Sequence, residues 1–390
     1  MISVSDALSH LFDLVTATEV EAVPLRQAAG RVLARDVVAT RTQPPFAASS
    51  MDGYALRQTE VEPDAMFKVI GEAAAGHRFD GVVKAGQAVR IFTGAPVPEG
   101  ADFVVIQEDT TRRGDLIMLG HDIGPKTNIR PAGGDFHAGD TMDAPRLLRP
   151  ADIALLASMN VATVPVYAKP RVAIIATGDE LVQPGEVPNP DQIIASNTYG
   201  LAALLEQHGA QCRMIPIARD TVPSLTQAFT MAQDADLIIT IGGASVGDHD
   251  LVAPVAAEMG MEQAFYKVAM RPGKPLMAGR LHDVPMIGLP GNPVSAMVCG
   301  TVFVVPVLRK MLGLPAAPAA RVDLPLGVDL PANGPREHYM RAMVRDGAVL
   351  PEDNQDSSLL GILSRADVLM VRPPRDGVRT AGEIIGCIPL

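Results

Sequence analysis

The stretch Arg171-Val172-Ala173-Ile174-Ile175-Ala176-Thr177-Gly178-Asp179-Glu180 indicates the fold class of this chain. Its first half is a continuous apolar run, typical of a strand buried on both faces, and its second half is a turn that carries acids. Two further segments repeat the arrangement: residues 237–241 precede a glycine-rich loop, and residues 285–289 precede Gly291-Asn292-Pro293. Helical patterns separate these strands, which predicts a doubly wound, mostly parallel sheet with ligand sites at the carboxyl ends of its strands.

The pattern extends outward from these strands in both directions. It predicts helices at about 197–209, 224–233, 250–258 and 293–311, and further strands at 214–217 and 265–269. From residue 20 to about 170, short strands alternate with Gly and Pro, so this half is predicted to be β-rich and to form two pieces. After a linker-like segment at 312–320, strands at 340–344 and 368–372 predict a small β domain.

Composition excludes several classes of protein. The chain has 390 residues, 47% hydrophobic and 20% charged, with a net charge of −11. This length corresponds to about two to four domains, and the chain is too apolar to be disordered. The acidic balance and the absence of Trp argue against nucleic-acid binding. Three distant cysteines form no CxxC pair, so no disulfide framework or thiolate zinc site is expected, and a reducing cytoplasm fits.

Two segments bear on membrane association. Val4, Leu8, Leu11 and Val15 fall at helical spacing, so the amino-terminal segment is predicted to be a packed amphipathic helix and not a signal peptide. The longest apolar stretch, 294–308, is shorter than the roughly 20 residues that span a bilayer. We therefore expect a soluble protein without membrane contact.

Three loops follow the predicted strand ends: residues 177–180, 242–250 and 291–295. In the third, Asn292 suits the N-cap and Pro293 the first turn of the following helix, which leaves free backbone N–H groups at its N-terminus. The small residues of the second let backbone amides approach an anion closely. Each glycine taken alone could serve only a tight turn, but three such loops at one sheet edge favour a phosphate-binding rim.

Acidic side chains occur in the same region, at Asp179, Glu180, Asp220, Asp248 and Asp250. Carboxylates beside a phosphate repel it unless a cation lies between them, and Mg²⁺ accepts one or two carboxylates together with phosphate oxygens. Asp248 and Asp250 could instead simply cap the helix that follows. The lone His249 is interpreted as a surface residue, and no histidine spacing supports zinc.

Positive charge is concentrated in Lys267-Val268-Ala269-Met270-Arg271-Pro272-Gly273-Lys274-Pro275. Two prolines hold this segment extended or turned, and its three cations are interpreted as anion ligands in preference to a plain charged loop. The β-rich half contains three irregular segments, 44–55, 93–102 and 130–140, in which acids lie among Gly and Pro. Physical reasoning alone leaves these three as loops of unassigned role.

With these segments in view, the chain resembles the molybdopterin molybdenumtransferase family, which includes bacterial MoeA and the C-terminal domain of gephyrin. The resemblance extends over nearly the whole length and rests on eight ordered stretches: 45–55, 93–105, 130–140, 171–181, Ser196-Asn197, 240–250, 267–275 and 288–296. It implies that the chain takes adenylylated molybdopterin and molybdate as substrates, inserts the metal at the dithiolene and releases AMP, with Mg²⁺ as cofactor. It also implies a homodimer in which the cleft of one subunit faces the β-rich domain of the other.

The resemblance further implies a multidomain α/β plus β fold with four parts. These are a molybdopterin-binding α/β domain (1–20 and 169–312), an elongated linking domain (21–43 and 140–168), an inserted β-rich domain (44–139) and a C-terminal β-barrel domain (313–390).

Site residues are carried over by position. A catalytic role is implied for Asp52, Thr93, Asp135, Glu180, Asp220, Asp250, Lys267 and Arg271, with Glu180 and Asp250 holding the metal. Arg271 stands where several members have lysine, and the two side chains are not interchangeable at a point contact. Substrate binding is expected from Thr177, Gly178, Asp179, Ser196, Asn197, Gly242, Gly243, Ser245, Val246, Gly247, Asp248, Pro272, Gly273, Lys274, Gly291, Asn292, Pro293 and Ser295. The segment 355–358 loosely matches a serine-containing pterin contact, from which Asp356 departs.

Two other functions are weighed against insertion. Adenylylation of molybdopterin by ATP uses a similar α/β domain alone, but this chain also has the β-rich arm. A scaffold that only binds partners would have no need of acids and cations gathered in one cleft. Expected partners are the adenylyltransferase and the acceptor molybdoenzymes, and the sequence leaves open tungstate in place of molybdate.

Overall fold

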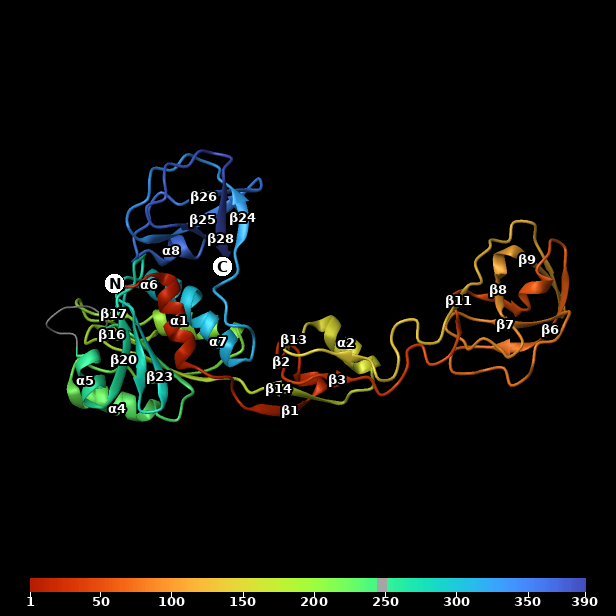
Figure 1. The fold of residues 1–390 in the computed structure, drawn as a ribbon, viewed down its shortest axis with the longest axis horizontal. Helices are drawn as coiled ribbons and strands as arrows, with labels where there is room; N and C mark the ends of the chain where they lie inside the picture. The colour runs from red at the N-terminus through yellow and green to blue at the C-terminus, as the bar shows by residue number, and fades with distance from the viewer. Residues whose placement is uncertain (244–250) are drawn as a thin grey trace.

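The computed structural model describes residues 1–243 and 251–390. The molecule is elongated (Figure 1): the α/β domain and the C-terminal domain lie together at one end, a small linking region follows, and a β-rich domain forms the far end. The chain runs out to the far end and back before it completes the α/β domain, so the two termini lie at the same end of the molecule.

The α/β domain is built on a six-stranded sheet of order β18-β15-β19-β23-β22-β20. The first four strands pair parallel to one another, β22 pairs antiparallel with β23, and β20 pairs antiparallel with β22. Their bounds are β15 Arg171–Ala176, β18 Gln211–Met214, β19 Leu237–Ile241, β20 Met261–Tyr266, β22 Met277–Leu281 and β23 Val284–Leu289. This is the doubly wound sheet that the sequence predicts, with antiparallel strands added at one edge.

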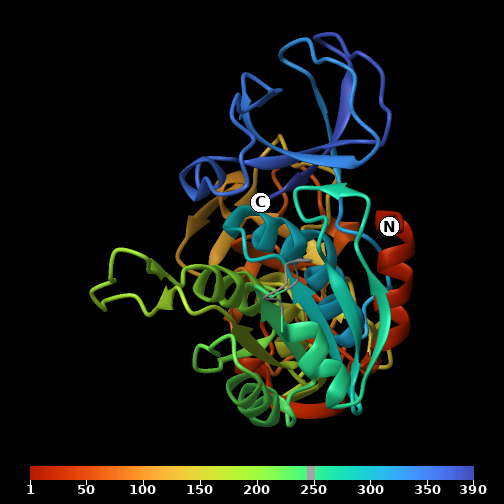
Figure 2. The same cartoon turned by 90° about the vertical axis from the view of Figure 1, so that its left-hand side faces the viewer.

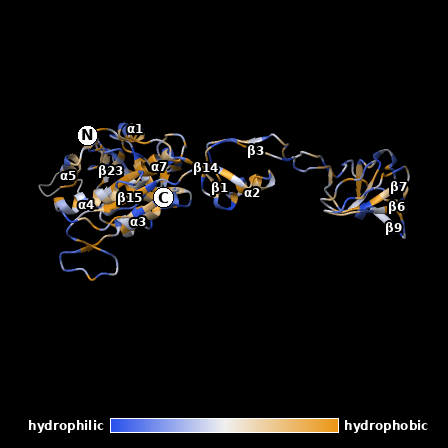
Figure 3. Cartoon of the chain, turned by 90° about the horizontal axis from the view of Figure 1, so that it is seen from below, coloured by the Kyte–Doolittle hydropathy of each residue, from blue (hydrophilic) through white to orange (hydrophobic). Residues whose placement is uncertain are grey.

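Alternate residues of the central strands enter two separate cores, because successive side chains of a strand point to opposite faces. Val172 and Ile174 pack with α1, α3, α6 and α7, whereas Ala173 and Ile175 pack with α4 and α5. The helices are α1 Val4–Leu14, α3 Asn197–Gln207, α4 Val222–Ala232, α5 Val252–Glu258, α6 Pro293–Cys299 and α7 Val305–Met311. The apolar residues gathered inside this domain are visible in Figure 3.

Two predicted strands are misplaced by a few residues. The strand predicted at 214–217 is β18, which ends at Met214, and the one predicted at 265–269 is β20, which ends at Tyr266. Both lie at edges of the sheet and are largely solvent-exposed, so their apolar residues do not mark where pairing begins. Strand β18 instead starts where Gln211 pairs with Arg171.

The helix that begins at Pro293 continues to Met311, with a π-helical segment, η4 (Gly300–Val304), between α6 and α7. Its 19 residues are long and apolar enough to cross a membrane, so the argument that this segment is too short to span a bilayer is wrong. Within its most apolar 18-residue window, 83% is buried inside the protein, and its residues pack with those of the sheet and α3, which makes it a core helix of the α/β domain.

The linking region contains the four-stranded sheet β1-β14-β2-β13 and the pair β12-β3. Its elements are β1 Val20–Pro24, η1 Leu25–Gln27, β2 Val32–Leu33, β3 Val37–Val38, β12 Thr141–Met142, β13 Arg146–Leu147, α2 Pro150–Ser158 and β14 Thr163–Tyr167. The far domain is a six-stranded sheet of order β8-β5-β7-β6-β10-β9 with the pair β11-β4. Its elements are β4 Ala48–Ser49, β5 Gly53–Leu56, η2 Gln58–Glu60, β6 Met66–Ala73, β7 Gln87–Ile91, β8 Phe103–Ile106, η3 Gln107–Asp109, β9 Thr110–Arg113, β10 Leu116–Leu119 and β11 Ile129–Arg130.

The C-terminal domain is a sheet of order β21-β25-β27-β28-β24, with β26 paired to β25. Its elements are β24 Val322–Pro325, β25 Glu337–Arg345, β26 Ala348–Pro351, α8 Leu360–Leu363, β27 Val368–Arg372 and β28 Ile384–Pro389. The edge strand β21 (Met270–Arg271) comes from the predicted cationic segment of the α/β domain and pairs with Glu337 and His338. The two domains therefore share a sheet directly beside the carboxyl ends of the parallel strands.

Candidate functional site

A cleft of about 750 Å³ lies at the carboxyl ends of β15, β19 and β23. It includes, from the predicted site, Thr177, Gly178, Glu180, Ser196, Asn197, Asp220, Gly242, Gly243, Gly291, Asn292 and Pro293. The sequence thus places eleven of its candidate residues around one cavity, at the sheet edge where ligands of doubly wound folds bind.

Close backbone approach explains the glycines of the three loops. Gly242 and Gly243 have φ of 96° and 60°, and a Cβ on Gly242 would lie 2.7 Å from the carbonyl oxygen of Thr177. A Cβ on Gly291 would lie 3.5 Å from the Cα of Gly242. The loops after β15, β19 and β23 are therefore packed against one another, and the glycines are required by this close approach. Phosphate binding by these loops stays a prediction.

Thr177 supplies a polar atom that the described residues leave unsatisfied. The residue is 4% exposed, and its Oγ1 finds no hydrogen-bond partner in residues 1–243 and 251–390. An unpaired buried hydroxyl costs about 1–3 kcal/mol. Thr177 lines the cleft, so a ligand group that reached this buried oxygen would offset the cost.

The N-terminus of α6 differs from the prediction in one respect. Asn292 is the N-cap residue, but its side chain makes no capping bond and donates instead to Ser357 Oγ at 3.1 Å. The N–H of Val294 donates to the carbonyl oxygen of Ser357 at 3.0 Å. One of the N–H groups predicted to be free is thus used by the C-terminal domain, and Asn197 fixes the adjacent loop by donating to the Gly291 carbonyl at 2.7 Å.

Three carboxylates, Asp179, Glu180 and Asp220, gather beside the cleft. None of them has an ion-pair partner in the described part of the chain. Desolvation, followed by the charges of Asp179 and Glu180, raises the pKa of Asp220 above its ordinary value. Burial and the two neighbouring acids thus both disfavour the ionised form of Asp220. No group of three or more potential ligands that could hold a metal ion is found among the described residues.

The cationic segment approaches the site from the side of the C-terminal domain. Pro275 lines the cleft, whereas Lys267, Arg271 and Lys274 do not appear in its wall. Lys267 has φ of 71°, and its Nζ lies 4.7 Å from the centre of the Tyr266 ring. Arg271 is exposed and pairs through its backbone with His338.

Several predicted residues lie elsewhere. Asp179 flanks the cleft, and Ser295 is buried within α6. Pro272 and Gly273 belong to a turn next to Cys299, where a Cβ on Gly273 would lie only 2.5 Å from the Cys299 sulfur. Ser245, Val246, Gly247, Asp248 and Asp250 fall outside the described residues.

Sequence reasoning missed the apolar wall of the cleft, formed by Ile193 and Ile194 of β17 (Ile193–Ile194), which pairs with β16 (Leu181–Val182). The segment between these two strands projects from the domain in Figure 2. Ile193 is 58% exposed. A two-residue apolar run of this kind has no periodicity that could mark it as part of a site.

Ser358 of the C-terminal domain also lines the cleft. Its N–H and hydroxyl both donate to Asp356 Oδ1, at 2.8 and 2.7 Å. Asp356, which departs from the family pattern, therefore shapes the serine-containing turn. These two bonds also hold the pKa of Asp356 below its ordinary value.

Asp52, Thr93 and Asp135 lie far from this cleft within one chain. Asp52 and Thr93 belong to the far domain, which lies at the opposite end of the molecule from the α/β domain (Figure 1), and Asp135 lies in the chain between β11 and β12. Asp135 is exposed, and its N–H donates to the carbonyl oxygen of Gln43. A single chain does not bring these residues together with Glu180.

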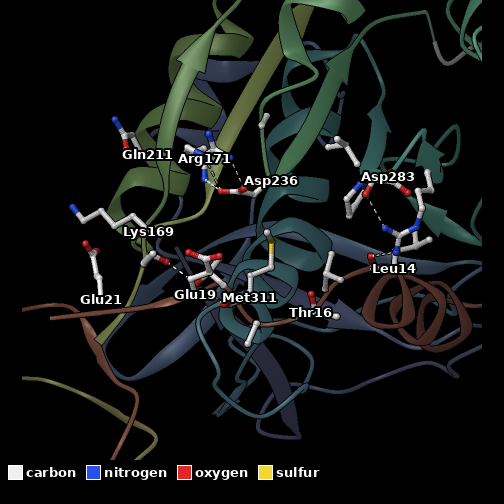
Figure 4. Close-up of a pocket in the computed structure, with 18 of the residues that line it drawn as sticks. Leu14, Thr16, Glu19, Glu21, Lys169, Arg171, Gln211, Asp236, Asp283 and Met311 are labelled. Atoms are coloured by element: carbon white, nitrogen blue, oxygen red, sulfur yellow. Dashed lines mark hydrogen bonds and ion pairs between the residues drawn. The ribbon is translucent and has the colours of Figure 1, made fainter. Parts of the chain in front are cut away.

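A second cleft of about 750 Å³ lies at the opposite edge of the sheet, where the α/β domain joins the linking region (Figure 4). Two of its arginines are engaged within the protein: Arg171 binds Asp236 in a bidentate pair, and Arg280 donates to the Leu14 carbonyl at 2.6 Å. Thr18 joins both sides by donating its hydroxyl to Ala168 and its N–H to Met311. This cleft is a domain junction.

Comparisons with known proteins bear on the same regions. Three family models match: the MoeA N-terminal region (domain I and II) at residues 2–160, a probable molybdopterin binding domain at 173–310, and the MoeA C-terminal region (domain IV) at 323–390.

Similar whole proteins carry consistent names. A molybdopterin molybdenumtransferase of Nostoc sp. is 39% identical over 328 residues, 80% of this chain and 75% of the relative. One of Staphylococcus aureus is 30% identical over 398 residues, 99% of this chain and 95% of the relative. The crystal structure of the molybdopterin biosynthesis MoeA protein of Pyrococcus horikoshii OT3 matches with a TM-score of 0.87 at 26% identity, over 100% of both chains.

Proposed function

Because this chain belongs to the molybdopterin molybdenumtransferase (MoeA) family, we propose that it inserts molybdate into adenylylated molybdopterin and releases AMP, the final step of molybdenum cofactor synthesis. The observation that carries the proposal is the cleft itself. Three loops meet at one sheet edge with the buried Thr177 hydroxyl and with carboxylates, and within residues 1–243 and 251–390 the hydroxyl has no hydrogen-bond partner and these carboxylates have no ion-pair partner. We place the reaction in the cytoplasm, where the free cysteines remain reduced.

No group of three or more Asp, Glu, His or Cys side chains among the described residues is arranged to hold a metal ion by itself, so Mg²⁺ would be held by one or two carboxylates together with substrate phosphate oxygens. Glu180 and Asp220 offer carboxylate oxygens without an ion-pair partner in the described part of the chain, and we propose that Glu180 holds the ion together with Asp250. When bound, Mg²⁺ neutralises the charge of the substrate phosphates. The protein's own part is to position the substrate: the Thr177 hydroxyl and the amides of the loops after β15 and β23 bind it and hold its phosphates beside the acids.

Molybdate reaches a protein whose net charge is −11. Lys267, Arg271 and Lys274 carry positive charge on the segment that borders the cleft through Pro275. We propose that these cations attract the oxyanion against the overall negative field. Tungstate has the same charge and is an alternative anion for this segment.

We further propose that the working unit is a homodimer. Asp52, Thr93 and Asp135 are implied in the reaction but lie far from the cleft of their own chain. A partner's arm supplies them when its far domain faces the cleft. Mixing inactive Asp52→Asn and Glu180→Gln subunits tests this directly, since heterodimers keep one intact site and restore about a quarter of the wild-type activity. Failure of every mixture to recover activity would exclude a site shared between subunits.

The two other functions make different predictions. A molybdopterin adenylyltransferase consumes ATP and free molybdopterin, and a scaffold shows neither reaction. The far domain and the shared sheet with the C-terminal domain favour insertion, because adenylylation needs neither of them. Contacts with an adenylyltransferase and with acceptor molybdoenzymes are proposed as the routes by which substrate arrives and product leaves.

The decisive experiment measures AMP release from adenylylated molybdopterin in the presence of Mg²⁺, with and without molybdate. Molybdate-dependent release of AMP and formation of active cofactor are expected. The variant Glu180→Gln is compared with Glu186→Gln, an exposed residue outside the cleft wall, and only the first is expected to lose activity. Release that ignores molybdate, or ATP-dependent adenylylation in its place, would contradict the proposal.

A further inference from the structure

Arg219 makes an unusual set of contacts beside the cleft. Its Nη1 lies within hydrogen-bond distance of three backbone carbonyl oxygens: Gly178 at 3.4 Å, Asp179 at 2.9 Å and Leu181 at 3.2 Å. One guanidinium nitrogen thus contacts three of the four backbone carbonyl oxygens of residues 178–181. This turn carries two of the three carboxylates of the site, Asp179 and Glu180.

The backbone of Arg219 is itself fixed to the sheet. Its N–H donates to Ser224 Oγ at 2.9 Å, at the start of α4. Immediately before it, Ala218 bridges to Thr177, and the N–H of Gly178 donates to the Ala218 carbonyl at 3.1 Å. Arg219 therefore reaches the turn from a segment that is already attached to the same loop.

The close approach of Glu180 requires a glycine at position 178. Gly178 has φ of 150°, and a Cβ there would lie 2.5 Å from the Glu180 carboxylate, so Glu180 folds back over the glycine. Three carbonyl dipoles converge on one point while acidic groups crowd nearby. A permanently charged guanidinium satisfies those carbonyls in a way that a neutral side chain does not.

Arg219 directs its side-chain hydrogen bonds to the backbone and forms no ion pair with the acids, although its charge opposes, as a smaller effect, the rise that burial causes in the pKa of Asp220. No ion pair within the described residues includes Arg219, Asp179, Glu180 or Asp220. Asp220 follows Arg219 directly in the chain, and its N–H donates to Asp179 Oδ1 at 3.2 Å. Through its contacts with the 178–181 turn and through the adjacent Asp220, Arg219 thereby links the positions of all three carboxylates.

We propose that Arg219 is a positioning residue that holds the 178–181 turn so that Glu180 and Asp220 present their carboxylates to a divalent cation. The inference rests on the proposed function, since it assigns Arg219 a part in the cation site of that reaction. Arg219 itself is not among the residues that line the cleft.

The test compares Arg219→Met with Arg219→Lys and with the control Arg213→Met. Arg213 lies on the neighbouring strand β18, carries the same charge, and binds Asp234 and the Met231 carbonyl far from the turn. Three quantities are measured: Mn²⁺ binding by titration calorimetry, the Mg²⁺ dependence of AMP release, and hydrogen exchange of the Leu181 and Ile193 amides. Melting temperatures establish that each variant is folded.

We expect Arg219→Met to weaken Mn²⁺ binding and raise the half-saturating Mg²⁺ concentration by about tenfold, as loss of a residue behind a metal ligand does. Activity at saturating Mg²⁺ falls less than about threefold, because the chemistry itself is intact. Arg219→Lys, which keeps a cation with three donors, recovers most of the binding. Both amides exchange faster in Arg219→Met alone.

Each contrary result has a distinct meaning. Equal Mn²⁺ affinity and equal exchange in Arg219→Met and Arg213→Met would overturn the positioning role while the insertion reaction stands. If wild-type protein neither binds Mn²⁺ nor releases AMP, the proposed function is wrong and the role of Arg219 toward a cation is wrong with it. Faster exchange with unchanged Mn²⁺ binding would show a structural contact only and would also overturn the inference.

Discussion

Thr93 donates both its backbone N–H and its hydroxyl to the same carboxylate oxygen of Asp52, at 2.8 and 2.7 Å. The two residues lie 41 positions apart and meet at the surface of the far domain. Both bonds favour the ionised carboxylate and hold the pKa of Asp52 below its ordinary value, with Arg90 adding a smaller effect in the same direction. Asp52 is therefore a fixed, charged acid that faces outward.

Removing the hydroxyl should affect activity more than folding. Thr93→Val keeps the backbone donor but loses the side-chain bond, so Asp52 is held by one bond in place of two and is less well fixed, and AMP release is expected to fall by about tenfold. Because the pair is exposed, the melting temperature should change by less than about 2 °C. Thr93→Ser retains both bonds and serves as the control; equal activity of the valine and serine variants would contradict the interpretation.

A trade between stability and activity is expected at Asp220. Burial and neighbouring acids raise the pKa of Asp220 in the folded state. At pH values above the ordinary Asp pKa, the ionised side chain therefore destabilises the folded protein. This destabilisation disappears as the pH falls and the group is protonated. Asp220→Asn should therefore melt at a higher temperature than wild type in metal-free buffer at pH 7 and release AMP more than about tenfold more slowly.

Added Mg²⁺ gives the second half of this test. The ion should raise the melting temperature of wild-type protein and have a smaller effect on Asp220→Asn, because one carboxylate is missing. Asp191→Asn, in an exposed loop nearby, should resemble wild type in both respects. If Asp220→Asn melts below wild type without metal, repulsion among the acids is not the dominant effect at this position.

The family, the doubly wound sheet and the multidomain α/β plus β fold expected from the sequence are confirmed. They could be predicted because buried parallel strands such as 237–241 are continuous apolar runs and because their loops carry glycines. Edge strands such as β18 could not be placed, since this strand begins where Gln211 pairs with Arg171, and these two polar residues show no hydrophobic pattern in the sequence.

The site was predictable only where its chemistry is local in sequence. Thr177, Gly242 and Gly291 each follow a strand and could be expected at one edge. Two other contacts depend on side-chain geometry between segments that are distant in sequence: the hydrogen bond from Asn292 to Ser357 and the hydrogen bonds from Arg219 to the 178–181 turn. The positions of the domain boundaries and the role of each site residue remain predictions.

The junction beside α7 depends on Gly313. This residue has φ of 73°, and a Cβ on it would lie 2.1–2.6 Å from atoms of the Tyr167 ring. Gly30 has nearly the same φ, 74°, with nothing within 4 Å of its Cβ position, so it is a matched control for backbone strain alone. Gly30→Ala should cost about 1 kcal/mol of stability, whereas Gly313→Ala should cost clearly more because the ring must move as well.

Urea unfolding of the two glycine variants measures the difference. An additional loss of about 1–3 kcal/mol is expected for Gly313→Ala over Gly30→Ala, the range for an overpacked contact. Gly313→Ala with Tyr167→Ala should recover part of the loss, since the clashing ring is absent. Equal destabilisation by both single changes would mean that the ring is displaced without cost.

The C-terminal domain should lose stability in mild acid because of His338. This side chain is buried, and burial together with Arg271, Arg341, Arg372 and Arg336 lowers the pKa of His338 to about 4. Between pH 6.5 and 4 the unfolded chain then binds a proton that the folded chain does not, so the stability contributed by the neutral ring is complete above pH 6.5 and falls as pH decreases through this window. One proton corresponds to at most about 1.4 kcal/mol per pH unit.

His338→Gln removes this titration, so its unfolding midpoint in urea should depend less steeply on pH between 6.5 and 4.5 than that of wild type. His208→Gln, which changes a partly buried histidine of the α/β domain, provides the control and should leave the slope of the C-terminal transition unchanged. Parallel curves for wild type and His338→Gln would show that the ring is protonated in the folded protein despite the four arginines.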